Sequence, residues 1–224
     1  MNPKHIAIVL DGNRRFAKKL LLEPWKGHEL GAEKLRKIFS WCKELGIKEL
    51  TLYCFSMQNF SRPKKEFDFL MNLFEREFLD IPKNQDINNN KVKIEVVGRL
   101  NLLPEKVQKA VKIAQDATKD YSDYKINFCL AYGGREEIVD AVNKIIKKDV
   151  KEIDEETMKN YLYLNSEPDL IVRTGGDNRT SNFLIWQSNY SEWFFTEKTW
   201  PEFEKEDLIK IIEEFKLRER RFGK

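Results

Sequence analysis

Short apolar runs alternate with amphipathic helical stretches along the whole of this 224-residue chain. The expected strands are residues 5–10, 50–55, 92–97, 125–131, 169–173 and 183–186. The expected helices are residues 14–21, 29–45, 64–80, 104–119, 134–148, 154–163 and 205–220. Strands separated by helices are joined by right-handed crossovers and run parallel. The sequence therefore predicts an α/β fold with a mostly parallel central sheet of about six strands flanked by helices.

The sequence shows no linker that would divide it into domains. Its most polar stretches are residues 83–90, which include three consecutive asparagines, and residues 147–156. Neither stretch contains proline or glycine, and each fits within a loop of a compact protein. A chain of this length can bury one substantial core. We therefore expect a single domain spanning residues 1–224.

The charge of the chain is nearly balanced. Lys and Arg total 40 and Asp and Glu total 37, which gives a net charge of +3. Proteins that bind nucleic acid usually carry a strong excess of basic residues, so the composition argues against nucleic acid as the main partner. No apolar run approaches the roughly 18 residues that a membrane span requires. Any membrane contact is therefore expected to be peripheral.

Cysteine and histidine usage indicates the compartment. Cys42, Cys54 and Cys129 are odd in number, widely spaced and surrounded by apolar neighbours, which is typical of reduced core residues. With two histidines and no CxxC pair, the sequence lacks the ligands of a structural zinc site. No signal peptide precedes the first expected strand. We expect a cytoplasmic protein whose membrane contact is peripheral, at the inner face of the membrane.

A polar turn, Asp11-Gly12-Asn13-Arg14-Arg15, follows the first expected strand. Gly12 permits a tight turn, and the following backbone N–H groups can surround phosphate oxygens together with both arginines. Phosphate would repel Asp11 unless a cation lay between them, and Mg²⁺ is typically held by carboxylates and substrate phosphates together. The alternative is an Asp cap with solvated arginines, and this segment alone does not decide between the two.

A second turn of this kind follows the fifth expected strand. Arg173, Arg179 and Ser181 can converge on one polyanion because two consecutive glycines between them let the backbone fold back. Arginines close to a buried strand need anionic partners. Asp169 and Asp177 are candidate partners within the chain, so a purely structural pairing stays open. Two such turns at the carboxyl ends of strands predict a diphosphate site with a metal.

A third polar loop follows the second expected strand. It carries a hydroxyl, an amide and a guanidinium on Ser56, Asn59 and Arg62, with Phe60 as an apolar wall. The alternative is a capped loop that binds nothing. His28 opens a long helix, where it can donate to a phosphate, although a lone histidine more often has a structural role.

Two helical stretches, residues 64–80 and 102–113, carry apolar side chains on more than one side. Core packing explains most of these side chains. A hydrophobic ligand channel between the helices and the sheet would account for the remainder. The sequence thus predicts an apolar tunnel beside the polar turns.

Several motifs in order resemble those of the cis-prenyltransferase family, whose bacterial members include undecaprenyl diphosphate synthases. They are HIAIVLDGN, GH at 27–28, LTLYCFSMQNFSRP, AYGGREEIVDAV, PDLIVRTGGDNRTSNFLIWQ, YSEWFFTEKTWPEF and the terminal RERRFG. Together they cover nearly the whole chain at compatible spacing. The aspartate-rich DDxxD motif of the trans-type synthases does not occur in the sequence.

The resemblance implies a transferase that adds isopentenyl diphosphate repeatedly, with cis geometry, to an allylic diphosphate such as farnesyl diphosphate. It further implies an undecaprenyl diphosphate product, used as a lipid carrier in cell-wall and peptidoglycan synthesis. Mg²⁺ as cofactor, a homodimer and a hydrophobic product tunnel are also implied. Membrane contact would then be made through the lipid product.

The resemblance also assigns roles to residues. Asp11 would be the essential catalytic and metal-binding carboxylate, Glu192 a second metal-binding carboxylate, and Asn59 a catalytic residue that assists proton removal together with Ser56. The substrate-binding positions would be Gly12, Asn13, Arg14, Arg15, Phe16, His28, Ser56, Met57, Gln58, Phe60, Arg62, Arg173, Arg179, Thr180, Ser181 and Arg221. Among these, Arg221 belongs to a terminal motif that reaches a neighbouring subunit's site.

Five positions depart from the family pattern. Glycine is usual at 14, tryptophan at 16 and 60, and glutamate at 58, where this chain has Arg14, Phe16, Phe60 and Gln58. Pro24 stands where the family usually has an arginine that holds the allylic diphosphate. Its loss removes a charge-assisted contact worth about 1.5–3 kcal/mol. Arg14 or Lys26 would have to replace that contact.

These departures motivate a second hypothesis, in which the chain is a non-catalytic or weakly active subunit of a heteromeric cis-prenyltransferase. A third hypothesis is a phosphohydrolase that uses Asp11 as nucleophile. It lacks support because the sequence does not supply the second aspartate expected of that chemistry.

Overall fold

A six-stranded, fully parallel sheet forms the centre of the molecule in the computed structural model, which describes residues 2–218. The strand order is β3-β4-β2-β1-β5-β6. The strands are β1 (His5–Val9), β2 (Glu49–Ser56), β3 (Val92–Val97), β4 (Tyr124–Tyr132), β5 (Leu170–Arg173) and β6 (Glu192–Phe195). The predicted α/β fold with a central parallel sheet is confirmed.

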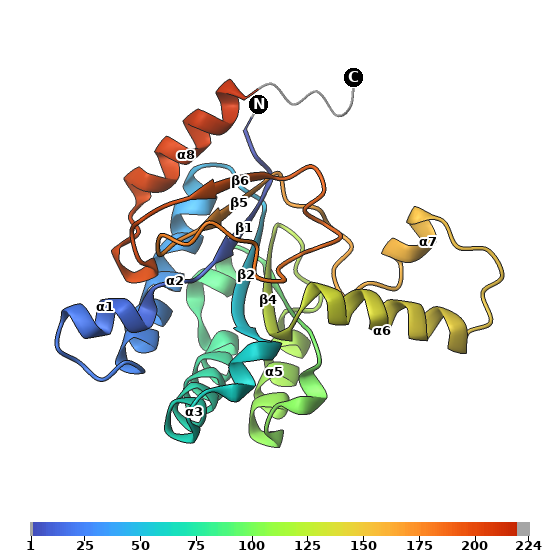
Figure 1. The fold of residues 1–224 in the computed structure, drawn as a ribbon, viewed down its shortest axis with the longest axis horizontal. Helices are drawn as coiled ribbons and strands as arrows, with labels where there is room; N and C mark the ends of the chain where they lie inside the picture. Colours follow the sequence, from blue (N-terminus) through green and yellow to red (C-terminus); the bar gives the residue numbers. More distant parts are fainter. Residues whose placement is uncertain (1, 219–224) are drawn as a thin grey trace.

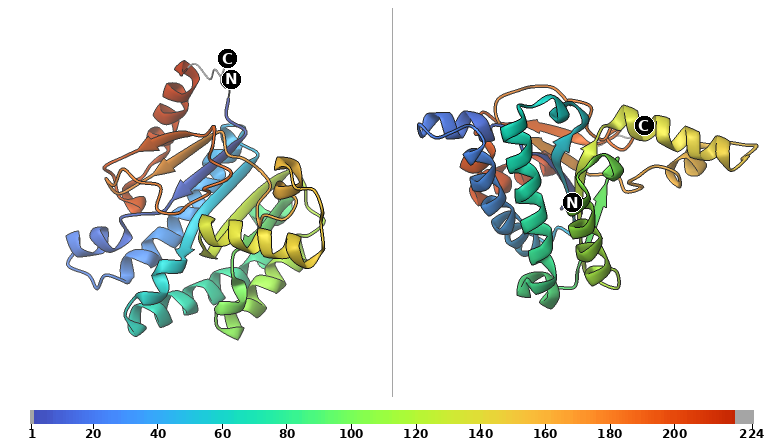
Figure 2. Two further views of the ribbon diagram at one scale, coloured as in Figure 1. Left: turned by 45° about the vertical axis from the view of Figure 1, so that its right-hand side comes forward. Right: turned by 90° about the horizontal axis from the view of Figure 1, so that it is seen from below.

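Helices lie mainly along one face and the sides of this sheet (Figures 1 and 2). They are α1 (Asn13–Lys19), α2 (Lys26–Glu44), α3 (Lys64–Asp80), α4 (Gln85–Asn89), α5 (Glu105–Thr118), α6 (Gly134–Lys147), α7 (Glu155–Lys159) and α8 (Lys205–Leu217). Short 3₁₀ turns are η1 (Met57–Ser61), η2 (Ile81–Lys83), η3 (Leu100–Leu102) and η4 (Trp200–Glu202). α1 and α2 form a hairpin on one side of the molecule, and α6 and α7 extend from the other (Figure 1).

The central strands β1, β2, β4 and β5 are largely buried because both of their faces are covered, and β1 and β5 are apolar apart from His5 and Arg173. In β1, Ile6 and Ile8 join the main core with α2, α3, α5 and α8, whereas Ala7 and Val9 face a second core. That second core is closed by loop residues such as Phe183, and not by a helix layer. The edge strand β3 instead alternates buried and half-buried residues, as expected of a strand with one covered face.

Two elements differ from the sequence prediction. Residues 183–186 do not form a strand; the last strand is β6, nine residues further on. Phe183 and Leu184 are buried, but Asn182 and Leu184 have φ values of 64° and 45°, which a strand does not allow. The predicted helix 154–163 is also wrong beyond α7, because the chain leaves the helix so that Leu162 and Leu164 can pack.

The three cysteines match the prediction of reduced residues. Cys42 and Cys129 are buried, Cys54 is half-buried, and all three are free thiols. Within residues 2–218, no helix has the length and apolar composition needed to cross a membrane.

Candidate active site

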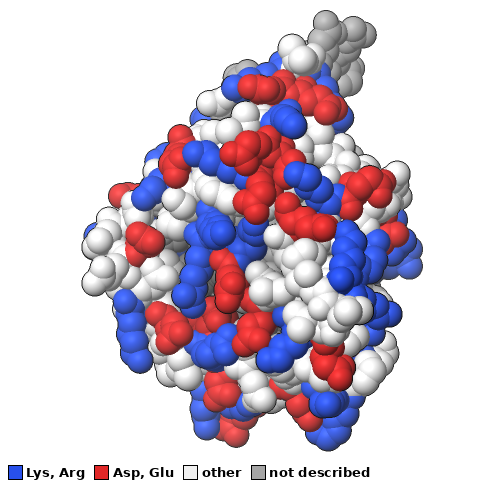
Figure 3. Space-filling model, turned by 90° about the vertical axis from the view of Figure 1, so that its left-hand side faces the viewer, with Lys and Arg blue, Asp and Glu red and all other residues white. Residues whose placement is uncertain are grey.

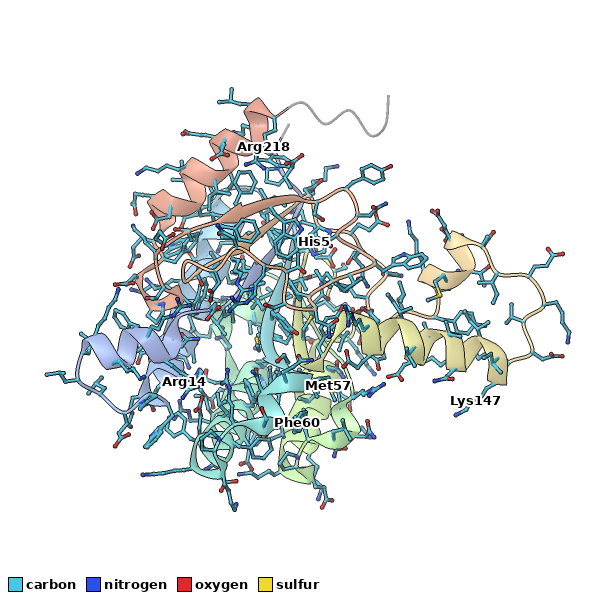
Figure 4. The ribbon with its side chains drawn as sticks, viewed as in Figure 1. His5, Arg14, Met57, Phe60, Lys147 and Arg218 are labelled. Atoms are coloured by element: carbon cyan, nitrogen blue, oxygen red, sulfur yellow. The ribbon has the colours of Figure 1, made fainter. Side chains whose placement is uncertain are left out.

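The polar turns after β1, β2 and β5 meet at one edge of the sheet. They do so because β1 lies between β2 and β5, with Val9 in register with Tyr53 on one side and Arg173 on the other. Parallel neighbours end at the same edge, so the residues that follow them converge. Figure 4 shows Arg14 and Met57 toward this edge, while His5 lies at the opposite one.

Asp11 is held in place by its own turn and by β5. Its Oδ1 accepts a hydrogen bond from the Gly12 N–H at 2.6 Å, and its Oδ2 accepts one from Arg173 Nη2 at 2.8 Å. Arg15 Nη2 lies 3.3 Å from Oδ1. Burial alone would raise the pKa of Asp11, but the hydrogen bonds from Arg173 and Gly12 outweigh it and lower the pKa. Asp11 is therefore an ionised carboxylate at neutral pH.

Gly12 is required by the shape of this turn. Its φ is +97°, in the region that side chains avoid. A Cβ there would lie 2.6 Å from Thr199 Cβ and 2.8 Å from Thr199 Cα. The turn therefore packs directly against the segment that precedes η4, and only glycine permits this approach.

Arg173 organises the turn after β5. Its side chain is 3% exposed, and Nη1 donates to Arg179 O and Ser181 Oγ, both at 2.6 Å. Its Nε is buried without a hydrogen-bond partner among the described residues. Arg179 is largely exposed and forms two hydrogen bonds with Asp177, which Arg15 also reaches at 3.3 Å.

Of the two candidate internal partners, the structure brings only Asp177 to the arginines. Asp169 Oδ2 instead accepts from the backbone N–H groups of Lys4 and His5, before β5 begins. The ion pairs of Asp177 with Arg15 and Arg179 are solvent-exposed at the rim, where such pairs contribute little to stability. They leave these arginines free to exchange a carboxylate for a diphosphate.

A second cationic cluster surrounds Glu66, which the sequence analysis did not identify. Glu66 is 2% exposed, and its carboxylate lies 3.1 Å from Arg62 Nη1, 3.2 Å from His28 Nε2 and 3.6 Å from Arg14 Nε. The hydrogen bond with His28 and the neighbouring arginines lower the pKa of Glu66, and burial lowers the pKa of His28. The only signal in the sequence was the spacing of Arg62 and Glu66, four residues apart.

The loop η1 is capped from within. Asn59 Oδ1 accepts from the Ser56 N–H at 3.0 Å, and the Ser56 side chain accepts from the Asn59 backbone. Both residues also line the cavity described below, so the capped-loop alternative and a ligand-facing role are compatible. Phe60 packs against Phe55 and Phe67, with ring centroids 5.1 and 5.9 Å apart, and forms part of an apolar wall.

A cavity of about 680 Å³ opens between these clusters. Its polar end is lined by Asp11, Asn13, His28, Ser56, Gln58, Asn59, Arg62, Arg173 and Ser181. Its apolar part is lined by Leu35, Phe39, Leu70, Leu73, Phe74, Phe78, Ile81, Ile87, Ile94, Ile126, Phe128 and Leu130. The predicted apolar channel between helices and sheet corresponds to this cavity, whose walls are α2, α3, η2, α4 and the sheet. The lining also includes Arg36, Glu77, Asp80, Asn84 and Asp86.

The second helical stretch assigned to the tunnel does not line it. Val107 and Val111 of α5 pack in the main core, while Leu102 and Ile113 are 46% and 47% exposed. The apolar side chains of residues 102–113 therefore lie partly in the main core and partly on the surface. Phe16, Met57 and Phe60 are likewise not part of the cavity lining, and Met57 and Phe60 pack against the main core.

Glu192 does not join Asp11 within the described chain. It pairs with Leu170 at the start of β5, whereas Asp11 follows the end of β1, about 10 Å or more further along the sheet. Its carboxylate binds Arg218 Nη1 at 2.8 Å. A metal site shared by these two carboxylates in one chain is thus not formed. Arg221 lies outside the described residues.

Asp11, at the polar end of the cavity, is still suited to bind a hard cation such as Mg²⁺. Within residues 2–218 no three His, Cys, Asp or Glu side chains cluster as a metal site. Asp11 carries an ionised carboxylate in the cavity wall, which is the ligand type that Mg²⁺ prefers when substrate phosphates complete its coordination.

Comparison with known proteins now identifies the family. The model of the family described as putative undecaprenyl diphosphate synthase matches residues 9–223. The chain belongs to this family, and it is a cis-prenyltransferase. Curated relatives in the undecaprenyl diphosphate synthase family include the "Tritrans,polycis-undecaprenyl-diphosphate synthase (geranylgeranyl-diphosphate specific)" of Thermococcus kodakarensis, 49% identical over 99% of this chain and 87% of that protein. The protein of the same name from Methanopyrus kandleri is 48% identical over 99% and 85% of the two chains.

Solved structures of this family share the fold. The lavandulyl diphosphate synthase of Lavandula x intermedia, determined with dimethylallyl diphosphate, superposes with a TM-score of 0.93 at 34% identity and covers 100% of this chain and 99% of its own. A probable undecaprenyl diphosphate synthase from Campylobacter jejuni gives a TM-score of 0.85 at 34% identity, with both chains fully covered. The single α/β domain therefore has the fold of a cis-prenyltransferase.

Proposed function

We propose that this chain condenses isopentenyl diphosphate with an allylic diphosphate primer and that its two cationic clusters hold the two diphosphate groups. The supporting observation is that both clusters border one cavity that becomes apolar away from them. Arg173, Arg179 and Ser181 would bind isopentenyl diphosphate. The primer diphosphate would lie between the turn at Gly12 and the cluster around Glu66.

The charge of the site suits two diphosphates. Five arginines (Arg14, Arg15, Arg62, Arg173 and Arg179) adjoin three carboxylates (Asp11, Glu66 and Asp177). The described site thus has a positive balance before the histidine or any metal is counted. Each guanidinium offers a fork of donors that matches phosphate oxygens.

Arg14 is the cation that we propose in place of the family arginine at position 24. Arg14 Nε lies 3.6 Å from the Glu66 carboxylate, which Arg62 and His28 also contact. Lys26, the other candidate, pairs with Glu29 at 3.3 Å and lies over the Phe69 ring. With Arg14 in this role, the proposed primer site would keep a cation although Pro24 replaces the usual arginine.

The reaction we propose breaks the bond between the allylic carbon and its diphosphate oxygen, and the electron pair leaves with diphosphate. The terminal alkene carbon (C4) of isopentenyl diphosphate forms the new bond to that carbon, which leaves positive charge on C3. A proton is then lost from the C2 methylene beside C3, and the electron pair of that C–H bond forms the new C2=C3 double bond. Arg15 and the backbone N–H groups after Asp11 would stabilise the departing diphosphate. Ser56 and Asn59 would orient the methylene, with diphosphate as the proton acceptor.

Mg²⁺, the cofactor implied by the resemblance, would be held by Asp11 and would neutralise diphosphate charge when bound. The hydrocarbon tail would enter the apolar part of the cavity, where each buried CH₂ contributes about 0.8 kcal/mol. This contribution would keep the growing chain bound between additions.

Primer and product are proposed from the relatives. Their names specify geranylgeranyl diphosphate and undecaprenyl diphosphate synthesis, so we propose geranylgeranyl diphosphate as the first primer to test. Farnesyl diphosphate as primer and a role in cell-wall synthesis remain predictions from the resemblance. So does the homodimer, in which Arg221 would approach the neighbouring site.

The decisive experiment incubates purified protein with labelled isopentenyl diphosphate, Mg²⁺ and either primer. We expect long-chain product from wild type and from Asp116→Asn, an exposed control on α5, but strongly reduced incorporation by Asp11→Asn. Equal incorporation by all three proteins would reject the role of Asp11. Failure of the wild type that is reversed by a partner protein would instead favour the heteromeric-subunit hypothesis.

A further inference from the structure

Three consecutive leucines form the tip of the α1–α2 hairpin. Leu20, Leu21 and Leu22, here called the leucine turn, are 50%, 95% and 45% exposed. The turn has a defined shape, since the Leu21 N–H donates to Lys18 O at 3.1 Å and the Leu22 N–H donates to Ala17 O at 2.9 Å. An ordered turn that presents contiguous leucines to solvent is unusual for a surface that contacts only water.

The folded chain gains nothing from the leucine at the centre of this turn. Leu21 follows the end of α1 with φ +57°, the conformation in which glycine is the usual residue. A leucine there is strained, and its side chain is almost wholly exposed. Folding therefore favours glycine at this position, and the leucine needs another explanation.

Basic and aromatic side chains surround the leucine turn. Lys18 precedes it, and no ion pair of Lys18 is formed within the described residues. Trp25 follows the turn, with Lys65 Nζ 4.4 Å from its ring centroid. Lys19 is paired with Glu202, and Glu23 is the one exposed acidic residue within the loop. Leucine, tryptophan and lysine together are the side chains that favour a membrane surface with anionic headgroups.

The place of the turn is also suitable. α1 begins two residues after Asp11, and its seven residues extend the hairpin about 10 Å from the polar end of the cavity. The side of the molecule that carries the hairpin shows uncharged areas bordered by Lys and Arg, with acidic side chains interspersed (Figure 3). On the proposed function, the diphosphate head of the product lies at this polar end of the cavity, one length of α1 from the leucine turn.

We infer that the leucine turn inserts into the headgroup region of an anionic phospholipid bilayer and docks the cavity mouth on the membrane. The reason for docking rests on the proposed function, because a long polyprenyl product partitions into lipid. A second copy of the chain is a less suitable partner for the leucine turn. Three leucines at the tip of a hairpin offer much less contact area than the roughly 800 Å² that each partner buries in a standard protein–protein interface.

Vesicle flotation tests this inference without substrate, so its failure is distinct from a failure of the proposed activity. We expect wild type to float with phosphatidylglycerol–phosphatidylcholine vesicles, and much less with phosphatidylcholine alone. Leu20→Ser, Leu21→Gly and Leu22→Ser combined should lower the floated fraction about tenfold. A control with Leu102→Ser, Ile113→Ser and Ile146→Ser removes as many exposed apolar side chains elsewhere and should float like wild type.

Two further measurements make the result decisive. Leu21→Gly alone should keep or raise the melting temperature while lowering flotation, so misfolding does not explain the loss. Condensation with a short, water-soluble primer should be unchanged in the triple leucine variant. Unaltered flotation of that variant would overturn the inference, as would absence of flotation by wild type. A change in its oligomeric state without a change in flotation would show a contact between copies and would overturn it too.

Discussion

Replacing Gly12 by alanine should lower the free energy of unfolding in two ways, through backbone strain and through steric overlap with Thr199. An alanine at φ +97° is strained by about 1–2 kcal/mol. Its Cβ would also lie within 2.6–2.8 Å of three carbon atoms of Thr199, including the backbone Cα, so the turn or the segment before η4 must move. Overpacking of this kind costs about a further 1–3 kcal/mol.

Gly46 provides the matched control. Its φ is +75°, but a Cβ there meets no atom within 4 Å. Gly46→Ala should therefore lose stability only through backbone strain. Gly12→Ala should therefore be less stable than Gly46→Ala by about 1–3 kcal/mol, the steric contribution alone. At about 2–4 °C per kcal/mol for a protein of this size, its melting temperature should be lower by about 2–12 °C.

The two variants should also differ in activity. Movement of the turn displaces the Gly12 N–H from Asp11 Oδ1 and weakens the bond to Arg173, so kcat/KM for condensation should decrease at least about tenfold. Gly46→Ala, at the end of α2, should retain wild-type kcat/KM. Thermal unfolding and steady-state assays of both variants measure these effects. Equal melting temperatures together with equal activities would refute the reasoning.

Three other predictions concern the site. The pKa of Asp11 is lowered in the folded protein, so the interactions of its carboxylate are complete above its unfolded pKa and are lost as pH falls through the folded value. A profile of kcat/KM against pH should therefore decrease on the acid side as Asp11 is protonated. Asp11→Asn should not show this decrease. Glu66→Gln should lower the free energy of unfolding in urea by about 1–2 kcal/mol, since Arg14 and Arg62 are partly solvated. Ile94→Phe, deep in the cavity near Ile126, should shorten the extracted product on chromatography, and unchanged product length would contradict the assigned tunnel.

Much of the scaffold was predictable because its signals are local. β1 and β5 are buried along their entire length and are apolar apart from His5 and Arg173, so each strand can be recognised from its own sequence without knowing its neighbours in the sheet. Residues that follow such strands must lie at the carboxyl edge of a parallel sheet, which is why Asp11 and Arg173 were predicted together and lie 2.8 Å apart. Residues 183–186 misled the same reasoning, because an apolar run can be buried in a turn as well as in a strand.

The sequence by itself determined which strands form the sheet and which polar turns follow them, since hydrophobic period and turn chemistry act over a few residues. Only the tertiary structure decided which charges meet. It brought Glu66 of α3 to His28 and Arg14 of the α1–α2 hairpin, and it directed Asp169 away from the arginines. Pairing of charges depends on distances between elements remote in sequence, and such distances are set by how helices pack on the sheet.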